Sequence, residues 1–176
     1  MHSDASYHSE TRARSRAAGF FFLDGKDDPC PEAPPPPLNG AVHILCEILK
    51  NVMSSAAEAE LGGLFRNGQE GYNIRNILTE MGHEQYGPTP IATDNSTAEG
   101  IANDTVKAKR SKAMDMRFYW IRDRVKQGQF RVHWKPGRDN KADYFTKHFP
   151  PSHHLQERPT YLQVASEGKQ EEVPRP

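Results

Sequence analysis

The amino-acid sequence predicts one α/β domain built on a mixed β-sheet. The chain has 176 residues, which is about the size of a single domain. Hydrophobic patterns typical of strands and of helices alternate along most of it, as in α/β proteins. The first strand patterns instead follow one another directly, as in antiparallel hairpins, so we expect antiparallel and parallel pairs in the same sheet.

The composition is polar but sufficient for one core. Hydrophobic residues make up 35% of the chain, and the mean hydropathy is -0.83. No apolar run approaches the roughly 18 residues of a membrane span, and the N-terminal residues do not resemble a signal peptide. We therefore expect an intracellular protein, cytoplasmic or nuclear, that is neither secreted nor embedded in a membrane. Cys30 and Cys46 are too few for a disulfide framework or a zinc site of four cysteines.

The net charge of zero results from two oppositely charged regions. Residues 1–104 contain 7 Lys or Arg and 15 Asp or Glu, whereas residues 105–148 contain 13 and 4. A basic region of this density can bind a phosphate backbone. The alternative is a solvated helix face, and an organised cluster of carboxylates elsewhere would favour the first interpretation.

Two strand patterns open the domain on either side of a proline-rich segment. Residues 14–23 contain an aromatic run, and residues 41–48 resume an apolar, partly β-branched pattern. The prolines of residues 24–40 cannot donate hydrogen bonds to a sheet. We expect a stiff loop here, joining the two strands as a hairpin.

A long helix is predicted after this hairpin. Ser55 and Glu58 form a capping box, and apolar residues at helical spacing follow until Gly82. Asn67-Gly68 would interrupt the helix or only weaken it.

The next elements are a short strand over residues 88–93 and a short helix opened by a second capping box at residues 96–99. Residues 107–127 show the longest helical pattern, and residues 129–134 alternate like a strand. Residues 141–148 predict a short closing helix. We expect the domain to cover residues 1–149, followed by a disordered tail over residues 150–176.

Four acids stand where strand ends and helix starts would converge at one edge of the sheet. They are Asp4, Glu60, Asp94 and Asp143. Oxygen ligands of this kind suit Mg²⁺, which is a hard cation. Carboxylates this close would repel one another without metal, so we expect at least one raised pKa in the metal-free protein.

Several short motifs resemble one known family in their order and spacing. They are Ser3-Asp4-Ala5-Ser6, Arg14-Ser15-Arg16-Ala17-Ala18-Gly19, Ser54-Ser55-Ala56-Ala57-Glu58-Ala59-Glu60-Leu61, Thr93-Asp94-Asn95-Ser96, Ser111-Lys112 and Ala142-Asp143-Tyr144-Phe145-Thr146-Lys147. Together they resemble the ribonuclease H domain at the C-terminal end of copia-type long-terminal-repeat retrotransposon polyproteins, which belong to the reverse transcriptase family. The resemblance covers roughly residues 3–148.

This resemblance implies a ribonuclease H-like fold with a five-stranded mixed sheet flanked by helices. It implies an endonuclease that hydrolyses the RNA strand of RNA–DNA hybrids with two Mg²⁺ ions, or Mn²⁺. By match to the family motif, Asp4, Glu60, Asp94 and Asp143 are the catalytic, metal-binding carboxylates. The polymerase portion of the same element is the partner that the resemblance suggests. No polymerase, integrase or nucleocapsid signature is found in the sequence, so we expect a detached fragment of such a polyprotein.

Two of these assignments have competitors. Glu58 competes with Glu60, but Glu58 serves the capping box, whereas Glu60 lies beside the apolar stripe of its helix. Asp139 competes with Asp143 but falls in a turn. We therefore favour Glu60 and Asp143.

Two departures from the family bear on activity. Ribonuclease H enzymes often carry a mobile histidine before the last acid, and Arg138 stands at that position here. The family also has a strand leading up to the first acid, whereas only three residues precede Asp4, so we expect a truncated first strand.

Candidate contacts to nucleic acid come from the basic region. They are Arg110, Arg117, Arg124, Lys126 and Arg138. Trp120 and Tyr119 adjoin this stripe and would either stack on nucleotides or, as the commoner case, pack in the core. The alternatives to a nuclease are a catalytically inactive remnant that binds nucleic acid and an interaction domain with neither property.

Overall fold

Three strands from the first half of the chain form the antiparallel part of the sheet. The computed structural model describes residues 1–23, 40–106 and 116–161. Within them, β1 (His2–Glu10) pairs with β2 (Arg14–Phe21), and β2 pairs with β3 (His43–Ile48), both antiparallel. The predicted hairpin across the proline-rich segment is therefore confirmed.

The other half of the sheet is parallel. β4 (Thr89–Thr93) pairs with β1 and with β5 (Phe130–Trp134), which gives the order β3-β2-β1-β4-β5. This mixed five-stranded sheet is the predicted fold class. β1 spans nine residues, and only two of them, His2 and Ser3, precede Asp4. Its pairing with β4 joins His2 to Ala92.

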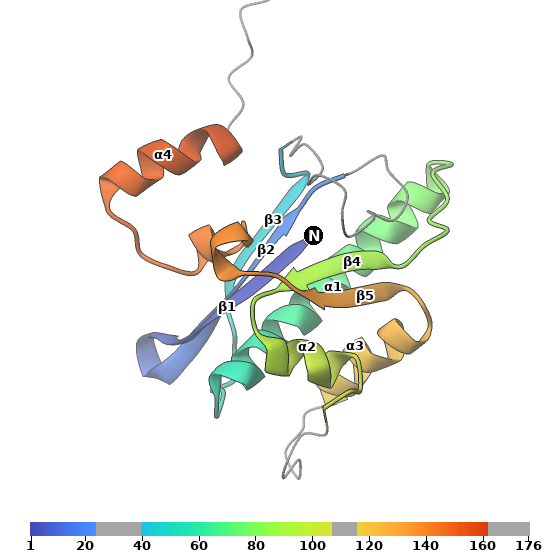
Figure 1. Ribbon diagram of the computed structural model, residues 1–176, viewed down its shortest axis with the longest axis horizontal. Helices are drawn as coiled ribbons and strands as arrows, with labels where there is room; N and C mark the ends of the chain where they lie inside the picture. The colour runs from blue at the N-terminus through green and yellow to red at the C-terminus, as the bar shows by residue number, and fades with distance from the viewer. Residues whose placement is uncertain (24–39, 107–115, 162–176) are drawn as a thin grey trace, which may run out of the picture.

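Helices α1 (Ala56–Glu80), α2 (Ser96–Ala102) and α3 (Met116–Lys126) cover one face of the sheet (Figure 1). Large apolar side chains between the sheet and these helices form the core: Phe21, Leu64, Ile91, Phe118, Ile121 and Phe130. No helix of the described residues is both long and apolar enough to cross a membrane. The N-terminal part of the predicted helix over residues 107–127 lies outside the described residues.

The long helix α1 begins as predicted and continues through Asn67-Gly68. The Ser55 hydroxyl accepts a hydrogen bond from the Glu58 amide at the N-cap. A Cβ at Gly68 would lie 2.8 Å from Ile121 Cδ1, so glycine permits the close approach of α1 to α3. Asn67 is fully buried and donates hydrogen bonds to β1 and β2. Tertiary contacts therefore outweigh the weak helix propensity of this pair.

The C-terminal segment differs from the prediction. Residues Gly137–Asp139 and Asp143–Phe145 form 3₁₀ turns instead of one short helix over 141–148. Residues Pro151–Tyr161, expected to belong to a disordered tail, form helix α4. Residues 162–176 lie outside the described part of the chain.

Aromatic contacts join the last residue of α4 to β2 and to the segment of Asp143. The Tyr161 ring stacks on Tyr144 with centroids 4.6 Å apart and meets Phe20 edge-on at 5.5 Å. Its hydroxyl donates to the Lys141 carbonyl oxygen at 2.8 Å. The sequence did not predict this helix because its composition is polar. A few aromatic rings dock it, without a continuous apolar stripe.

Removing the Tyr161 ring should destabilise the protein. We expect Tyr161→Ala to lower the free energy of unfolding by about 1–3 kcal/mol, because it removes several aromatic contacts and a hydrogen bond. Tyr161→Phe keeps the rings together and should lose only about 0.5–1.5 kcal/mol. Urea denaturation of both variants checks this, and equal midpoints for Tyr161→Ala and the wild type would contradict the docking of α4.

Candidate metal centre

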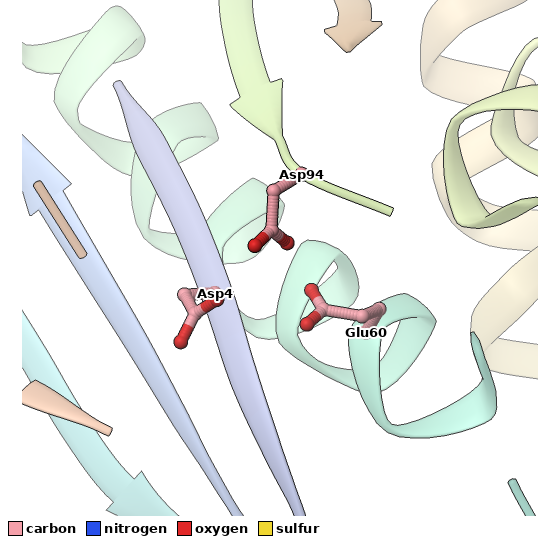
Figure 2. A group of neighbouring side chains, drawn as sticks. All are labelled: Asp4, Glu60 and Asp94. Carbon is pink, nitrogen blue, oxygen red and sulfur yellow. The ribbon is translucent and has the colours of Figure 1, made fainter. Parts of the chain in front are cut away.

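Three carboxylates from distant parts of the sequence meet at one edge of the sheet. Asp4 lies on β1, Glu60 lies in the second turn of α1, and Asp94 directly follows β4. One carboxylate oxygen of each lies within 4.8 Å of the others. Figure 2 shows the three side chains converging on a common space.

A hydrogen bond to β1 holds Glu60 in this position. Its Oε1 accepts a hydrogen bond from the Ala5 amide at 3.1 Å, which ties α1 to β1. Its Oε2 is buried and has no hydrogen-bond partner among the described residues. Glu58 instead accepts a hydrogen bond from the Ser54 amide at 2.6 Å, at the exposed start of the helix. Glu60, not its competitor, is thus the glutamate that joins the cluster.

Burial and mutual repulsion perturb the acids of the cluster. Burial, followed by the charges of Asp4 and Asp94, raises the pKa of Glu60 to about 9. Burial also raises the pKa of Asp4 to about 6, with a hydrogen bond from the Thr146 hydroxyl acting in the opposite direction. These are the raised pKa values expected of convergent carboxylates without metal.

Asp143 lies beside the three acids but outside their closest grouping. It opens the 3₁₀ turn Asp143–Phe145, and its Oδ1 pairs with the Lys147 ammonium group. Its charge contributes to raising the pKa of Asp4. Its competitor Asp139 is exposed in the preceding turn, where its Oδ2 lies 3.9 Å from Arg138 Nε.

Buried polar contacts that the sequence did not reveal hold the segment of Asp143 against β1. The Asn140 side chain donates to the Ser3 carbonyl oxygen at 2.8 Å, and the Lys141 amide donates to His2 Nδ1 at 2.9 Å. Burial, followed by nearby positive charges, lowers the pKa of His2 to about 3, so the ring is a neutral acceptor. These partners are more than 130 residues apart, and no local pattern indicates them.

The predicted nucleic-acid contacts fall into different environments. Arg138 is exposed, and the adjacent Gly137 lies close to the Asp94 carboxylate. The Arg124 guanidinium packs over Trp120 and Tyr72 within the fold. Lys126 pairs with Asp104 at 3.2 Å. Arg110 lies outside the described residues, and so does the side chain of Arg117.

The donor set fits a hard divalent cation. Mg²⁺ prefers carboxylate oxygens and retains several water ligands, and three carboxylates with one buried, unpartnered oxygen meet that requirement. Asp4, Glu60 and Asp94 could therefore hold a metal ion. Binding would also relieve their repulsion.

The raised pKa of Glu60 predicts a pH dependence of stability in the metal-free protein. The native state keeps a proton that the unfolded chain releases, so the free energy of unfolding should fall as pH rises from about 4.5 to about 9. One such proton contributes at most about 1.4 kcal/mol per pH unit. Urea titrations in EDTA should show that Glu60→Gln removes this component.

The comparison with Glu60→Gln is needed because the titration of His2 changes the free energy of unfolding with pH in the opposite direction. Its lowered pKa makes the protein more stable as pH rises from about 3 to about 6.5. Subtracting the variant curve from the wild-type curve cancels this contribution. Parallel curves would show that Glu60 does not titrate in the way its burial implies.

Comparison with curated proteins finds similarity to plant transposon polyproteins. The chain is 28% identical over 149 residues to the retrovirus-related Pol polyprotein from transposon TNT 1-94 of Nicotiana tabacum, covering 85% of this chain and 10% of that polyprotein. It is 32% identical over 98 residues to the Pol polyprotein from transposon RE2 of Arabidopsis thaliana, covering 56% and 7%. The chain thus spans a tenth or less of these relatives. No family model matches.

Solved structures with the same fold are ribonucleases H. LC11-RNase H1, in complex with an RNA/DNA hybrid, superposes with a TM-score of 0.55 at 11% identity, covering 82% of this chain and 90% of that one. The N-terminal RNase H domain of a Mycobacterium tuberculosis protein gives 0.51 at 14% identity, covering 82% and 88%. The homologues of this chain are therefore retrovirus-related Pol polyproteins of plant transposons, and its fold is ribonuclease H-like.

Proposed function

We propose that this chain is the ribonuclease H domain of a copia-type retrotransposon polyprotein and that it hydrolyses the RNA strand of RNA–DNA hybrids with a divalent metal. The observation that carries the proposal is the convergence of Asp4, Glu60 and Asp94 at one edge of a ribonuclease H-like sheet. The transposon relatives and the hybrid bound by LC11-RNase H1 support the same substrate class. Residues 1–149 would form the hydrolytic domain.

The residues of the cluster would have different roles, according to their positions. Asp4, Glu60 and Asp94 would hold the metal, and Asp143, whose charge acts on Asp4, would complete the site. Bound Mg²⁺ or Mn²⁺, as a pair of ions, supplies an activated water and stabilises the leaving oxygen in phosphodiester hydrolysis. The Thr146 hydroxyl orients the Asp4 carboxylate by its hydrogen bond.

Substrate contacts would come from the basic region around this site. Arg138 is exposed and adjoins the residue that lies against Asp94, so its guanidinium could reach a phosphate near the scissile bond. Discrimination of RNA from DNA would depend on contacts to the 2′-hydroxyl groups. The polymerase portion of the element would present the hybrid in the intact polyprotein.

A second candidate function is hybrid binding without turnover. Two observations favour it: Arg138 replaces the histidine expected before the last acid, and the Lys147 ammonium group pairs with Asp143. Lys147 would compete with a cation for this carboxylate. Such a remnant would retain the acid cluster. The geometry of the cluster therefore does not distinguish the two candidates, and a measurement of cleavage does.

A cleavage assay distinguishes the two candidates. The chain is incubated with an RNA–DNA hybrid labelled on its RNA strand, in Mg²⁺ and in EDTA, with Asp94→Asn as the matched control. Cleavage of the RNA strand in Mg²⁺ by the wild type alone supports the nuclease. Binding without cleavage supports the remnant, and equal cleavage by Asp94→Asn would reveal a contaminating nuclease.

A further inference from the structure

We propose that the exposed indole of Trp134 is a stacking surface for a nucleotide of the bound hybrid, immediately beside the candidate metal centre. This inference rests on the proposed function and adds a specific contact to it. Trp134 is the last residue of β5.

The sheet places Trp134 next to the acid cluster. In the parallel pairing of β4 with β5, Trp134 lies opposite Thr93, the residue before Asp94. The indole Nε1 donates a hydrogen bond to the Asp94 carbonyl oxygen at 2.9 Å. The ring is therefore held in one position, against the backbone of a proposed metal ligand.

Trp134 is exposed at a place in its strand where a core residue would be expected. Phe130 and Val132 precede it at alternate positions and are 1% and 3% exposed, whereas Trp134 is 52% exposed. Alternation directs all three to the same face of the sheet. β5 thus continues beyond the core and presents a large ring, with its polar end satisfied, to solvent at the edge that carries the site.

The surroundings of Trp134 suit a nucleotide better than an apolar partner. Lys135 follows it directly, and Arg138 is exposed four residues later. Aromatic rings flanked by cations bind nucleic-acid strands by stacking on bases while the cations neutralise phosphates. The proposed metal site would engage the adjacent phosphate, so one strand could contact both features.

Of the two aromatic residues of α3 beside the basic stripe, Trp120 packs within the fold and Tyr119 is exposed. Trp120 meets Phe65 edge-on at 5.5 Å and lies beside Arg124. The Tyr119 ring is half-exposed on α3, with the Arg122 guanidinium 5.8 Å from its centroid. Trp134, in contrast, is hydrogen-bonded to the backbone of Asp94, an acid of the cluster.

Intrinsic fluorescence tests the contact directly, because the chain has two tryptophans. Trp120→Phe leaves Trp134 as the only indole, and Trp134→Phe leaves Trp120. Each variant, carrying Asp94→Asn to prevent cleavage, is titrated with hybrid in Mg²⁺. Binding is followed separately by the anisotropy of a fluorescein label on the DNA strand.

We expect the hybrid to quench about half or more of the Trp134 signal and little of the Trp120 signal. If anisotropy rises while the Trp134 signal stays constant, the stacking contact is wrong and the proposed function stands. If anisotropy does not rise in the variants or in the wild type, the proposed function and this inference both fail.

Affinity measurements provide a second readout that does not depend on the Trp120 variant. Trp134→Ala should weaken hybrid binding about 5- to 100-fold while the dependence of affinity on salt stays unchanged, because no phosphate contact is lost. Arg138→Ala should instead reduce the salt dependence. Trp134→Phe, which keeps an aromatic face, should restore most of the affinity. A Trp134→Ala affinity equal to the wild type would overturn the contact.

Discussion

Glu60→Gln is expected to reduce cleavage of the hybrid on the order of a thousandfold, while Glu58→Gln leaves it near the wild-type rate. Removing a carboxylate that holds a catalytic metal forfeits several kcal/mol of transition-state stabilisation. Glu60 Oε2 is buried and unpartnered among the described residues. One oxygen of the Glu60 carboxylate lies within 4.8 Å of a carboxylate oxygen of Asp4 and of Asp94.

Glu58 is a matched control because it lies two residues away on the same helix. Its carboxylate accepts hydrogen bonds from the Ser54 amide and hydroxyl at the exposed N-terminus of α1. Glutamine can accept the same bonds in a capping box, so the change in stability should stay within about 0.5 kcal/mol. The two substitutions therefore separate metal binding from helix stability.

Single-turnover cleavage rates and Mg²⁺ titrations by calorimetry provide the measurements. The heat of Mg²⁺ binding should fall with Glu60→Gln and persist with Glu58→Gln. A Glu60→Gln protein that cleaves normally would show that the cluster is not the catalytic site. If both variants lost activity together with thermal stability, the defect would lie in the fold of α1.

The elements that the sequence predicted well are those whose patterns are local. The capping box at Ser55 and the alternation of residues 129–134 correspond to the start of α1 and to β5. The choice of Glu60 over Glu58 also depended on local spacing along one helix. Such features can be predicted because each is specified within a few residues of sequence.

The features that the sequence did not predict depend on contacts between distant segments. Helix α4 is held by the rings of Tyr161, Tyr144 and Phe20, which come from three separate stretches. Trp134 is half-exposed, although its strand pattern alone implies burial. The inward packing of Arg124 against Trp120 likewise depends on tertiary contacts. Hydrophobic periodicity contains no information on these pairings.

The second large effect is expected at Asn67, the buried residue that joins α1 to the strands carrying the site. Its Nδ2 donates to Ser3 Oγ and to the Ala18 carbonyl oxygen, both at 2.8 Å. Ser3 immediately precedes Asp4, so this contact helps to set the position of α1, and with it Glu60, relative to β1. A Cβ at Gly19 would overlap the Asn67 amide oxygen, so the packing here leaves no room for rearrangement.

Asn67→Asp should lower the free energy of unfolding by about 3–5 kcal/mol at neutral pH, because it buries an unpaired charge and leaves the Ala18 carbonyl without its donor. Asn76→Asp makes the same chemical change at an exposed position of α1 and should cost less than about 0.5 kcal/mol. Urea denaturation at pH 5 and pH 8 measures both.

The pH comparison identifies the physical cause of this loss. Burial should raise the pKa of the new carboxyl group, so the native variant holds a proton that the unfolded chain releases, and its stability should fall as pH rises. Asn67→Asp should therefore be less destabilised at pH 5 than at pH 8. A loss that is equal at both pH values, or equal to that of Asn76→Asp, would show that Asn67 does not link α1 to β1 and β2 through a desolvated amide.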